Sequence, residues 1–134
     1  MILQELYSIA EAEDIPIYYG DFPEVESMSV QYAGRCVIGM DNALVGQNAV
    51  EHLAHELGHC VRGAFYHPRE LKRVRRKMEH KADEWMIRKL LPVDVLKAAI
   101  FPRCEYWQIA EELGCSERLL RSAVEYYTDT GEFP

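Results

Sequence analysis

Residues 50–63 read VEHLAHELGHCVRG and hold three of the chain's five histidines, at positions 52, 55 and 59. On an α-helix, residues three or four positions apart share a face, so these rings form one stripe with Glu56 beside it. The opposite face is aliphatic and carries Val50, Leu53, Ala54, Leu57 and Val61. The pattern predicts a helix that packs into the core through its aliphatic face. Its histidines and Glu56 then lie on the face that is free for another role.

Residues 55–59, HELGH, match the pattern HExxH. Its two histidines lie one helical turn apart and can share one zinc ion. Glu56 would stand beside the metal and take a proton from a water molecule that the metal acidifies. The metzincin class is excluded, because that class has glycine and histidine where this chain has Arg62 and Phe65. The HExxH pattern alone is only moderately specific, so a third ligand is needed.

Three residues downstream are candidates for the third ligand: His67, Glu79 and His80. Glu79 lies twenty residues beyond His59, at the edge of the apolar stripe of the next predicted helix, and Asp83 follows one turn later on the same face. A pair of carboxylates at that boundary is costly to desolvate unless it meets a cation. Zinc would supply one.

HELGH followed by residues 79–92, EHKADEWMIRKLLP, resembles the ImmA/IrrE group of zinc metallopeptidases. The second motif of that group is a glutamate, two residues, then Ala-Asn or Ala-Asp, before a helix that ends in a Leu-Leu-x-Pro-like sequence. Here these positions are Glu79, Ala82, Asp83 and Leu90-Leu91-Pro92. The glutamate with an aspartate four residues later is also similar to the thermolysin-like arrangement. The resemblance covers about residues 15–92 and, more loosely, the C-terminal helices.

The resemblance implies a small sheet against an active-site helix, one catalytic zinc ion, and limited proteolysis of a cytosolic regulatory protein, such as a repressor of the helix-turn-helix type. Carried over residue by residue, it makes His55, His59 and Glu79 the zinc ligands and leaves the fourth position to water. Glu56 would be the general base and then the proton donor to the leaving amine. Asp83 would accept a hydrogen bond from a ligand imidazole, that of His55 in the first place.

The whole chain is expected to form one α+β domain of residues 1–134, with a zincin-like core of residues 1–92 and a helical extension of residues 93–134. A small antiparallel or mixed three-stranded sheet would pack on the active-site helix pair. Its strands are expected in Ile15–Gly20 and in a hairpin, Ser27–Asp41, that turns at Ala33-Gly34. Helices are expected at about residues 2–13, 48–62, 69–91, 93–100, 104–113 and 117–127.

Four residues mark helix ends: Pro68 as the first residue of a helix, Gly63 and Gly114 as C-terminal caps, and Ser116 as an N-cap. The last residues, TDTGEFP, are expected to be a tail.

No apolar run approaches the roughly 20 residues that a membrane span requires, and the N-terminal MILQELYSIAEAED is acidic and amphipathic, unlike a signal peptide. The protein is therefore expected to be soluble and cytoplasmic, without a membrane partner. Its four cysteines, Cys36, Cys60, Cys104 and Cys115, include no C-x-x-C pair. Reduced, mostly buried thiols are expected.

The net charge is -7, but nine of the fifteen basic residues fall between Arg69 and Lys89. We expect this run to be a solvated helix face, and a nucleic-acid partner is not favoured. Residues 108–127 resemble a helix-turn-helix, but Arg118 and Arg121 are accompanied by carboxylates. Packing or protein recognition is favoured there over DNA reading.

Several alternatives stay open at this point. The protein is either the peptidase described above, a zinc-stabilised DNA-binding or protein-binding regulator without proteolysis, or a hydrolase of a non-peptide amide. His52 is expected to be exposed or hydrogen-bonded, and residues 34–38 to hold an extended peptide by edge pairing. Tyr66, His67, Tyr126 and Tyr127 are unranked candidates for stabilising an oxyanion. The native metal and the oligomeric state are undetermined.

Overall fold

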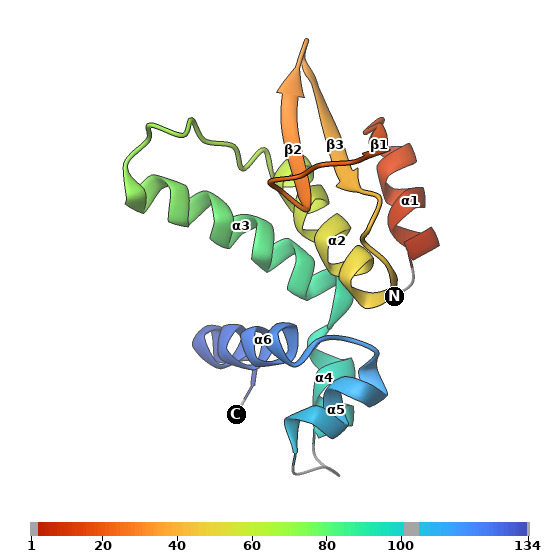
Figure 1. The fold of residues 1–134 in the computed structure, drawn as a ribbon. Coiled ribbons are helices and arrows are strands. Elements are labelled where there is room, and N and C mark those ends of the chain that lie inside the picture. Colours follow the sequence, from red (N-terminus) through yellow and green to blue (C-terminus); the bar gives the residue numbers. More distant parts are fainter. Residues whose placement is uncertain (1–2, 101–104, 134) are drawn as a thin grey trace. The chain divides into compact units, whose positions relative to one another are not determined.

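A computed structural model describes residues 3–100 and 105–133 of the chain (Figure 1). Within these ranges the protein is α+β, with six helices and one mixed sheet of three strands, as predicted. The chain divides into two compact units, Met1–Met86 and Ile87–Pro134. The division falls inside a helix, a few residues before the predicted boundary between residues 92 and 93. No helix in the described ranges is long and apolar enough to cross a membrane.

The sheet of the first unit has the strand order β1-β3-β2. β1 (Ile17–Gly20) runs parallel to β3 (Arg35–Asp41), and β2 (Ser27–Tyr32) runs antiparallel to it. β2 and β3 form the predicted hairpin, and both turn residues have positive φ, 51° at Ala33 and 78° at Gly34, as a tight two-residue turn requires. Among the described residues, β3 pairs on both sides from Ile38 to Asp41, whereas Arg35, Cys36 and Val37 pair with β2 alone. The edge pairing of a peptide with residues 34–38 therefore stays a prediction. The outer strand of the hairpin is β2.

The core of the first unit lies between the sheet and two helices. α2 (Gly46–Arg62) packs against β2 and β3, and α1 (Leu3–Ala12) packs against α2. The aliphatic face predicted for α2 is its packing face, although Val61 near its end is 37% exposed. Gly63 ends α2 with a φ of 61°, as predicted for its cap. The fully buried side chains of this core include Leu6, Ile38, Met40, Leu53 and Leu57.

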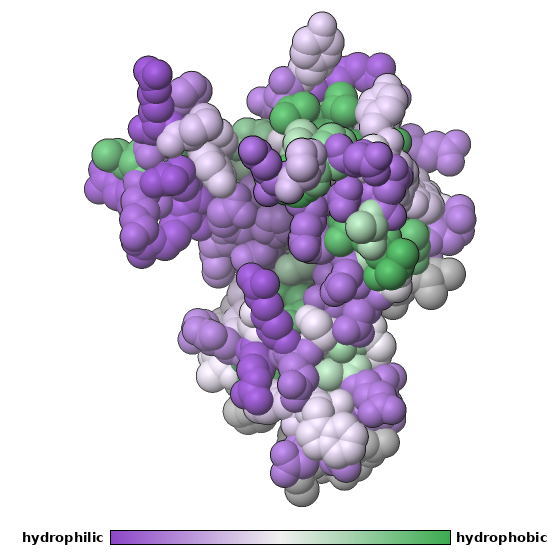
Figure 2. Space-filling view, viewed as in Figure 1, coloured by the Kyte–Doolittle hydropathy of each residue, from purple (hydrophilic) through white to green (hydrophobic). Residues whose placement is uncertain are grey.

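The second long helix, α3 (Lys72–Leu90), begins later than predicted. Pro68 does not start it. Instead His67 closes a turn, in which its carbonyl accepts from the amide of Glu70 at 2.9 Å and its ring Nδ1 accepts from the amide of Arg69 at 3.1 Å. Hydrophilic side chains cover the first part of α3 (Figure 2). This solvated basic face, as predicted, consists of exposed Lys72, Arg73, Arg75, Arg76 and Lys77.

The second unit contains α4 (Val93–Ile100), α5 (Tyr106–Leu113) and α6 (Glu117–Thr130). Ser116 caps α6 as predicted, since its hydroxyl oxygen accepts from the amide of Leu119 at 3.1 Å. The predicted helix start at Cys104 lies outside the described residues. The side chains buried here include Leu96, Ile109, Leu120, Ala123 and Tyr127.

The chain end is not the tail that the sequence predicts. α6 continues to Thr130, Phe133 is buried, and the guanidinium of Arg88 pairs with the carboxylate of Glu132 at 2.7 Å. The hydroxyl of Tyr127, in the same segment, donates to the carbonyl of Leu91 at 2.8 Å. An aromatic residue and an ion pair therefore hold the last residues against their own unit.

Cys36 of β3 and Cys60 of α2 form a disulfide, with a Cα–Cα distance of 5.7 Å. The prediction of reduced thiols is therefore wrong for this pair. The packing of β3 on α2 explains the difference, because it brings two residues 24 positions apart within the Cα separation that a disulfide spans. Cys115 is buried, and Cys104 lies outside the described residues.

Candidate metal centre

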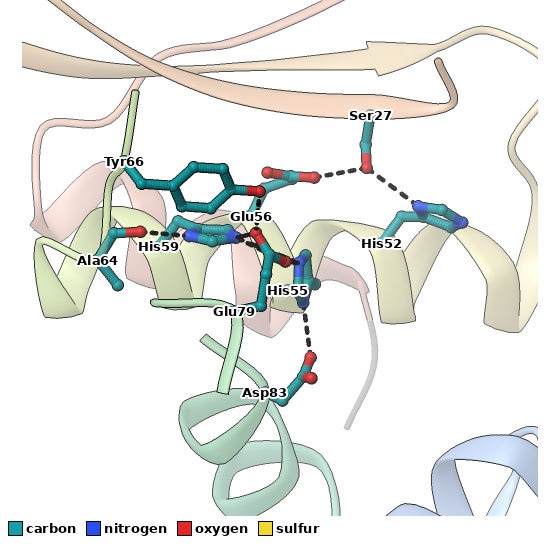
Figure 3. Close-up of polar contacts among 9 residues, drawn as sticks. All are labelled: Ser27, His52, His55, Glu56, His59, Ala64, Tyr66, Glu79 and Asp83. Atoms are coloured by element: carbon teal, nitrogen blue, oxygen red, sulfur yellow. Dashed lines mark hydrogen bonds and ion pairs between the residues drawn. The ribbon is translucent and has the colours of Figure 1, made fainter. Parts of the chain in front are cut away.

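Three side chains from two helices converge on one point in the first unit (Figure 3). The Nε2 atoms of His55 and His59, both on α2, lie 3.2 Å apart. Glu79 of α3 approaches both rings, with Oε1 at 3.0 Å from Nε2 of His55 and 3.3 Å from Nε2 of His59. These three residues could hold a metal ion. The spacing suits one, because two ligands at about 2.0 Å from a tetrahedral zinc lie roughly 3.3 Å apart.

The helices can meet at this point because Gly58 has no side chain. A Cβ atom at Gly58 would lie 2.5 Å from the carbonyl oxygen and 3.0 Å from the Cα of Ala82 on α3. One turn further along, the guanidinium of Arg62 pairs with the carboxylate of Glu84 at 2.8 Å. The glycine inside HELGH therefore sets how closely Glu79 can approach the two histidines.

Hydrogen bonds on the far side of each ring fix how the histidines point. Nδ1 of His55 lies 2.8 Å from Oδ1 of Asp83, the contact that the sequence predicts. Nδ1 of His59 lies 2.6 Å from the carbonyl oxygen of Ala64. Because both partners are acceptors, each Nδ1 carries the hydrogen and donates it, which leaves the two Nε2 atoms facing Glu79 as the positions that bind either a proton or a metal. The Ala64 carbonyl was not predicted, because a side-chain pattern contains no signal for a backbone acceptor.

The pKa of each of the three residues is shifted by its neighbours in the group. Burial lowers the pKa of His55, but hydrogen bonds to Asp83 and Glu79 outweigh that effect and raise it to about 10. Burial also opposes the shift at His59, where the hydrogen bonds to Glu79 and the Ala64 carbonyl raise the pKa. The two imidazoles in turn hold the pKa of Glu79 far below its usual range. In the absence of a metal, the imidazoles therefore bind protons tightly. A divalent cation would have to displace the protons from the Nε2 atoms.

Glu56 is one of two buried charged or polar side chains in the described residues, at 7% exposure, and the other is His59. The hydroxyl of Ser27, at the start of β2, donates to Oε2 of Glu56 at 2.7 Å. Oγ of Ser27 also lies 3.0 Å from Nδ1 of His52, whose Nε2 lies 2.7 Å from Oε2 of Glu26. His52 is thus hydrogen-bonded, as predicted. Ser27 and Glu26 were not predicted, since their contacts depend on how the sheet seats on α2.

Of the four unranked oxyanion candidates, Tyr66 contacts the metal-binding group within the first unit. Its hydroxyl donates to Oε2 of Glu79 at 2.8 Å, and this hydrogen bond, more than burial, raises the pKa of the phenol. Tyr126 and Tyr127 lie in the second unit. His67 accepts a local backbone hydrogen bond. In the described ranges, neither His67 nor His80 belongs to the metal-binding group.

No protein-family model matches this chain, and no curated protein matches it. The likeness to the ImmA/IrrE group therefore remains a likeness of two short motifs. Function has to be inferred from the chemistry of this group of side chains and its neighbours.

Proposed function

We propose that this protein is a zinc-dependent endopeptidase with a zincin-like active-site helix pair, which makes limited cuts in a regulatory protein. One observation carries the proposal. Two imidazoles of α2 and the carboxylate of Glu79 lie within ligand spacing of one another, and the buried carboxylate of Glu56 stands next to His55 on the same helix. Two histidines and a glutamate, with an open fourth position, form a ligand set typical of catalytic zinc.

The proposed roles follow from the chemistry of each side chain. His55, His59 and Glu79 would hold the zinc ion, which would supply a Lewis acid for the scissile carbonyl and lower the pKa of water. Glu56 accepts the proton of the attacking water and delivers it to the leaving nitrogen. Asp83 and the Ala64 carbonyl hold the two imidazoles in the tautomer that a metal needs. Because its hydroxyl lies beside Glu79, Tyr66 is our choice for donating a hydrogen bond to the developing oxyanion.

The outer edge of β2 is our proposed place for the substrate. In the described residues β2 pairs with β3 alone, and its first residue, Ser27, contacts Glu56. An extended peptide that adds to this edge would bring its own backbone toward the centre. Only an unfolded segment of a substrate protein can bind in this extended way. This requirement fits limited cleavage in a linker of a repressor better than digestion of folded domains.

We propose a cytoplasmic location from the N-terminal sequence, which is unlike a signal peptide, and from the resemblance. Structural disulfides are rare in that compartment, so the Cys36–Cys60 link does not support it. Free thiols can be alkylated in the cell extract before the protein is purified. The thiols that a reductant then releases would show whether the link forms in the cell.

The proposal is tested with purified wild type, Glu56→Gln and His59→Ala. Metal analysis should find about one zinc per chain in wild type and Glu56→Gln, and much less in His59→Ala. A peptide library from a proteome digest, and a helix-turn-helix repressor encoded beside the gene where one exists, serve as substrates for mass spectrometry. New termini should arise with wild type alone. Equal zinc in wild type and His59→Ala, or equal cleavage by Glu56→Gln, would end the idea.

The same variants separate the alternative functions. A protein-binding regulator would remove the repressor from its operator equally well as wild type and as Glu56→Gln. A DNA-binding regulator would bind duplex DNA with an affinity that falls with salt and survives that substitution. Turnover of small amides without peptide cleavage would indicate a non-peptide hydrolase.

A further inference from the structure

We propose that Glu26, His52 and Ser27 form a chain of hydrogen bonds that positions the carboxylate of Glu56 for proton transfer. This inference rests on the proposed function, in which Glu56 is the general base. These three residues, called the positioning chain below, connect a surface carboxylate to the buried one (Figure 3 shows Ser27, His52 and Glu56).

The contacts of the positioning chain are short and continuous. They measure 2.7 Å from Glu26 Oε2 to His52 Nε2, 3.0 Å from His52 Nδ1 to Ser27 Oγ, and 2.7 Å from Ser27 Oγ to Glu56 Oε2. Exposure falls along it, from 69% for the side chain of Glu26 to 34% for that of His52 and 7% for Glu56. The sheet holds its outer end, since the carbonyl of Glu26 accepts from the amide of Asp41 at 2.9 Å.

Counting hydrogens gives each contact a direction when both ring nitrogens of His52 carry a hydrogen. Three contacts need three hydrogens, and neither carboxylate supplies one when it is ionised. The hydroxyl of Ser27 provides one to Glu56, and the ring of His52 provides the other two when each nitrogen carries a hydrogen. The Ser27 oxygen then accepts from Nδ1 while its own hydrogen points at Glu56. Turning the Ser27 side chain to another rotamer would lose both contacts, so the histidine fixes the serine and the serine fixes the glutamate.

This arrangement occupies one oxygen of Glu56 and leaves the other available. Ser27 binds Oε2, and among the described residues no side chain hydrogen-bonds to Oε1. A general base needs an oxygen within hydrogen-bond reach of the proton that it accepts. The positioning chain therefore supplies a fixed carboxylate with one free acceptor.

Serine, histidine and glutamate are also the residue types of nucleophilic triads. That role does not fit here, because the hydroxyl hydrogen of Ser27 points to Glu56 and not to His52. A serine in this state is not deprotonated by its histidine. A second metal site does not fit either, because in the described residues Glu26, His52 and Glu56 form no metal-binding group.

The test uses zinc-loaded wild type, Ser27→Ala, Ser27→Thr and His52→Ala, with cleavage of a library peptide and a crystal structure of each. Ser27→Ala should lower kcat about ten- to a hundredfold, as loss of an orienting partner does, with KM little changed. Ser27→Thr keeps the hydroxyl and should restore most of the loss. Zinc content should equal that of wild type throughout.

The crystal structures provide a readout that does not depend on turnover. Glu56 should occupy one rotamer in wild type and Ser27→Thr, and several in Ser27→Ala and His52→Ala. Ser29→Ala, in the same strand, is the matched control, and in it Glu56 should stay ordered. An unchanged Glu56 rotamer in Ser27→Ala, an unchanged kcat, or a loss of zinc would each overturn the proposal. If wild type cuts no peptide, the proposed function fails, while the rotamers of Glu56 still decide the positioning.

Discussion

Adding one methyl group at Gly58 should weaken zinc binding without touching a ligand. The new Cβ would lie 2.5 Å from the carbonyl oxygen of Ala82, and ordinary contact begins at 3.4 Å. The two helices must therefore separate locally by about 0.9 Å, the difference of these distances. Metal sites tolerate deviations of about 0.2 Å in ligand distance. Glu79 moves with Ala82, which lies one turn away on α3, so it would lose its spacing to the histidines.

The assay compares wild type and Gly58→Ala by zinc affinity and by urea unfolding of the metal-free protein. We expect zinc affinity to fall at least tenfold, as for other losses of ligand orientation. Overpacking should cost about 1–3 kcal/mol, partly offset by about 1 kcal/mol from the better helix propensity of alanine. Zinc affinity is therefore the more sensitive measure.

Ala82→Gly provides the control for the Gly58 experiment. The atoms nearest the added methyl group belong to the backbone of Ala82, so removing its side chain should not rescue Gly58→Ala. Zinc affinity and stability of Gly58→Ala within error of wild type would refute the reasoning. Full rescue by Ala82→Gly would show that a side-chain clash, and not helix separation, is the cause.

The remaining predictions concern the ligands and the second unit. Glu79→Gln should lose most of its bound zinc in metal analysis while Glu84→Gln, on the same helix, retains it; equal loss would mean that the helix and not the ligand matters. In metal-free protein the pKa of His55 is raised from 6.5 to about 10, so its stabilisation is complete below about pH 6.5 and is lost as pH rises toward 10. Urea unfolding of wild type and His55→Gln should converge over that window, and parallel curves would contradict this. Tyr127→Phe leaves the buried carbonyl of Leu91 without its donor and should cost about 1 kcal/mol in urea unfolding, whereas no change would show that another donor replaces it.

Much of the fold can be predicted from the sequence because it depends on neighbours within one turn of chain. The spacing of apolar residues in residues 50–61 gives the helix and its packing face. Gly63 and Ser116 mark helix ends through local backbone geometry and a local hydrogen bond. The ligand positions 55 and 59 belong to this class, because both come from one helix.

Two of the missed features depend on contacts between distant segments, and the start of α3 depends on a local turn. Ser27 reaches Glu56 only because β2 seats on α2 in one register. Glu132 was predicted to lie in a tail because the sequence does not show that the distant Arg88 pairs with it. The start of α3 was predicted too early because Pro68 suits a helix start, whereas the local turn at His67 takes up the amides of Arg69 and Glu70.

The bond between Cys36 and Cys60 makes the chain sensitive to how it is prepared. It closes a loop of about 25 residues, and opening such a loop should cost roughly 3 kcal/mol through the freedom that the denatured chain regains. A sample purified with a thiol reductant and one purified without it would then be two different materials, with separate melting temperatures. The oxidation state of each batch should therefore be established before variants from different preparations are ranked against one another.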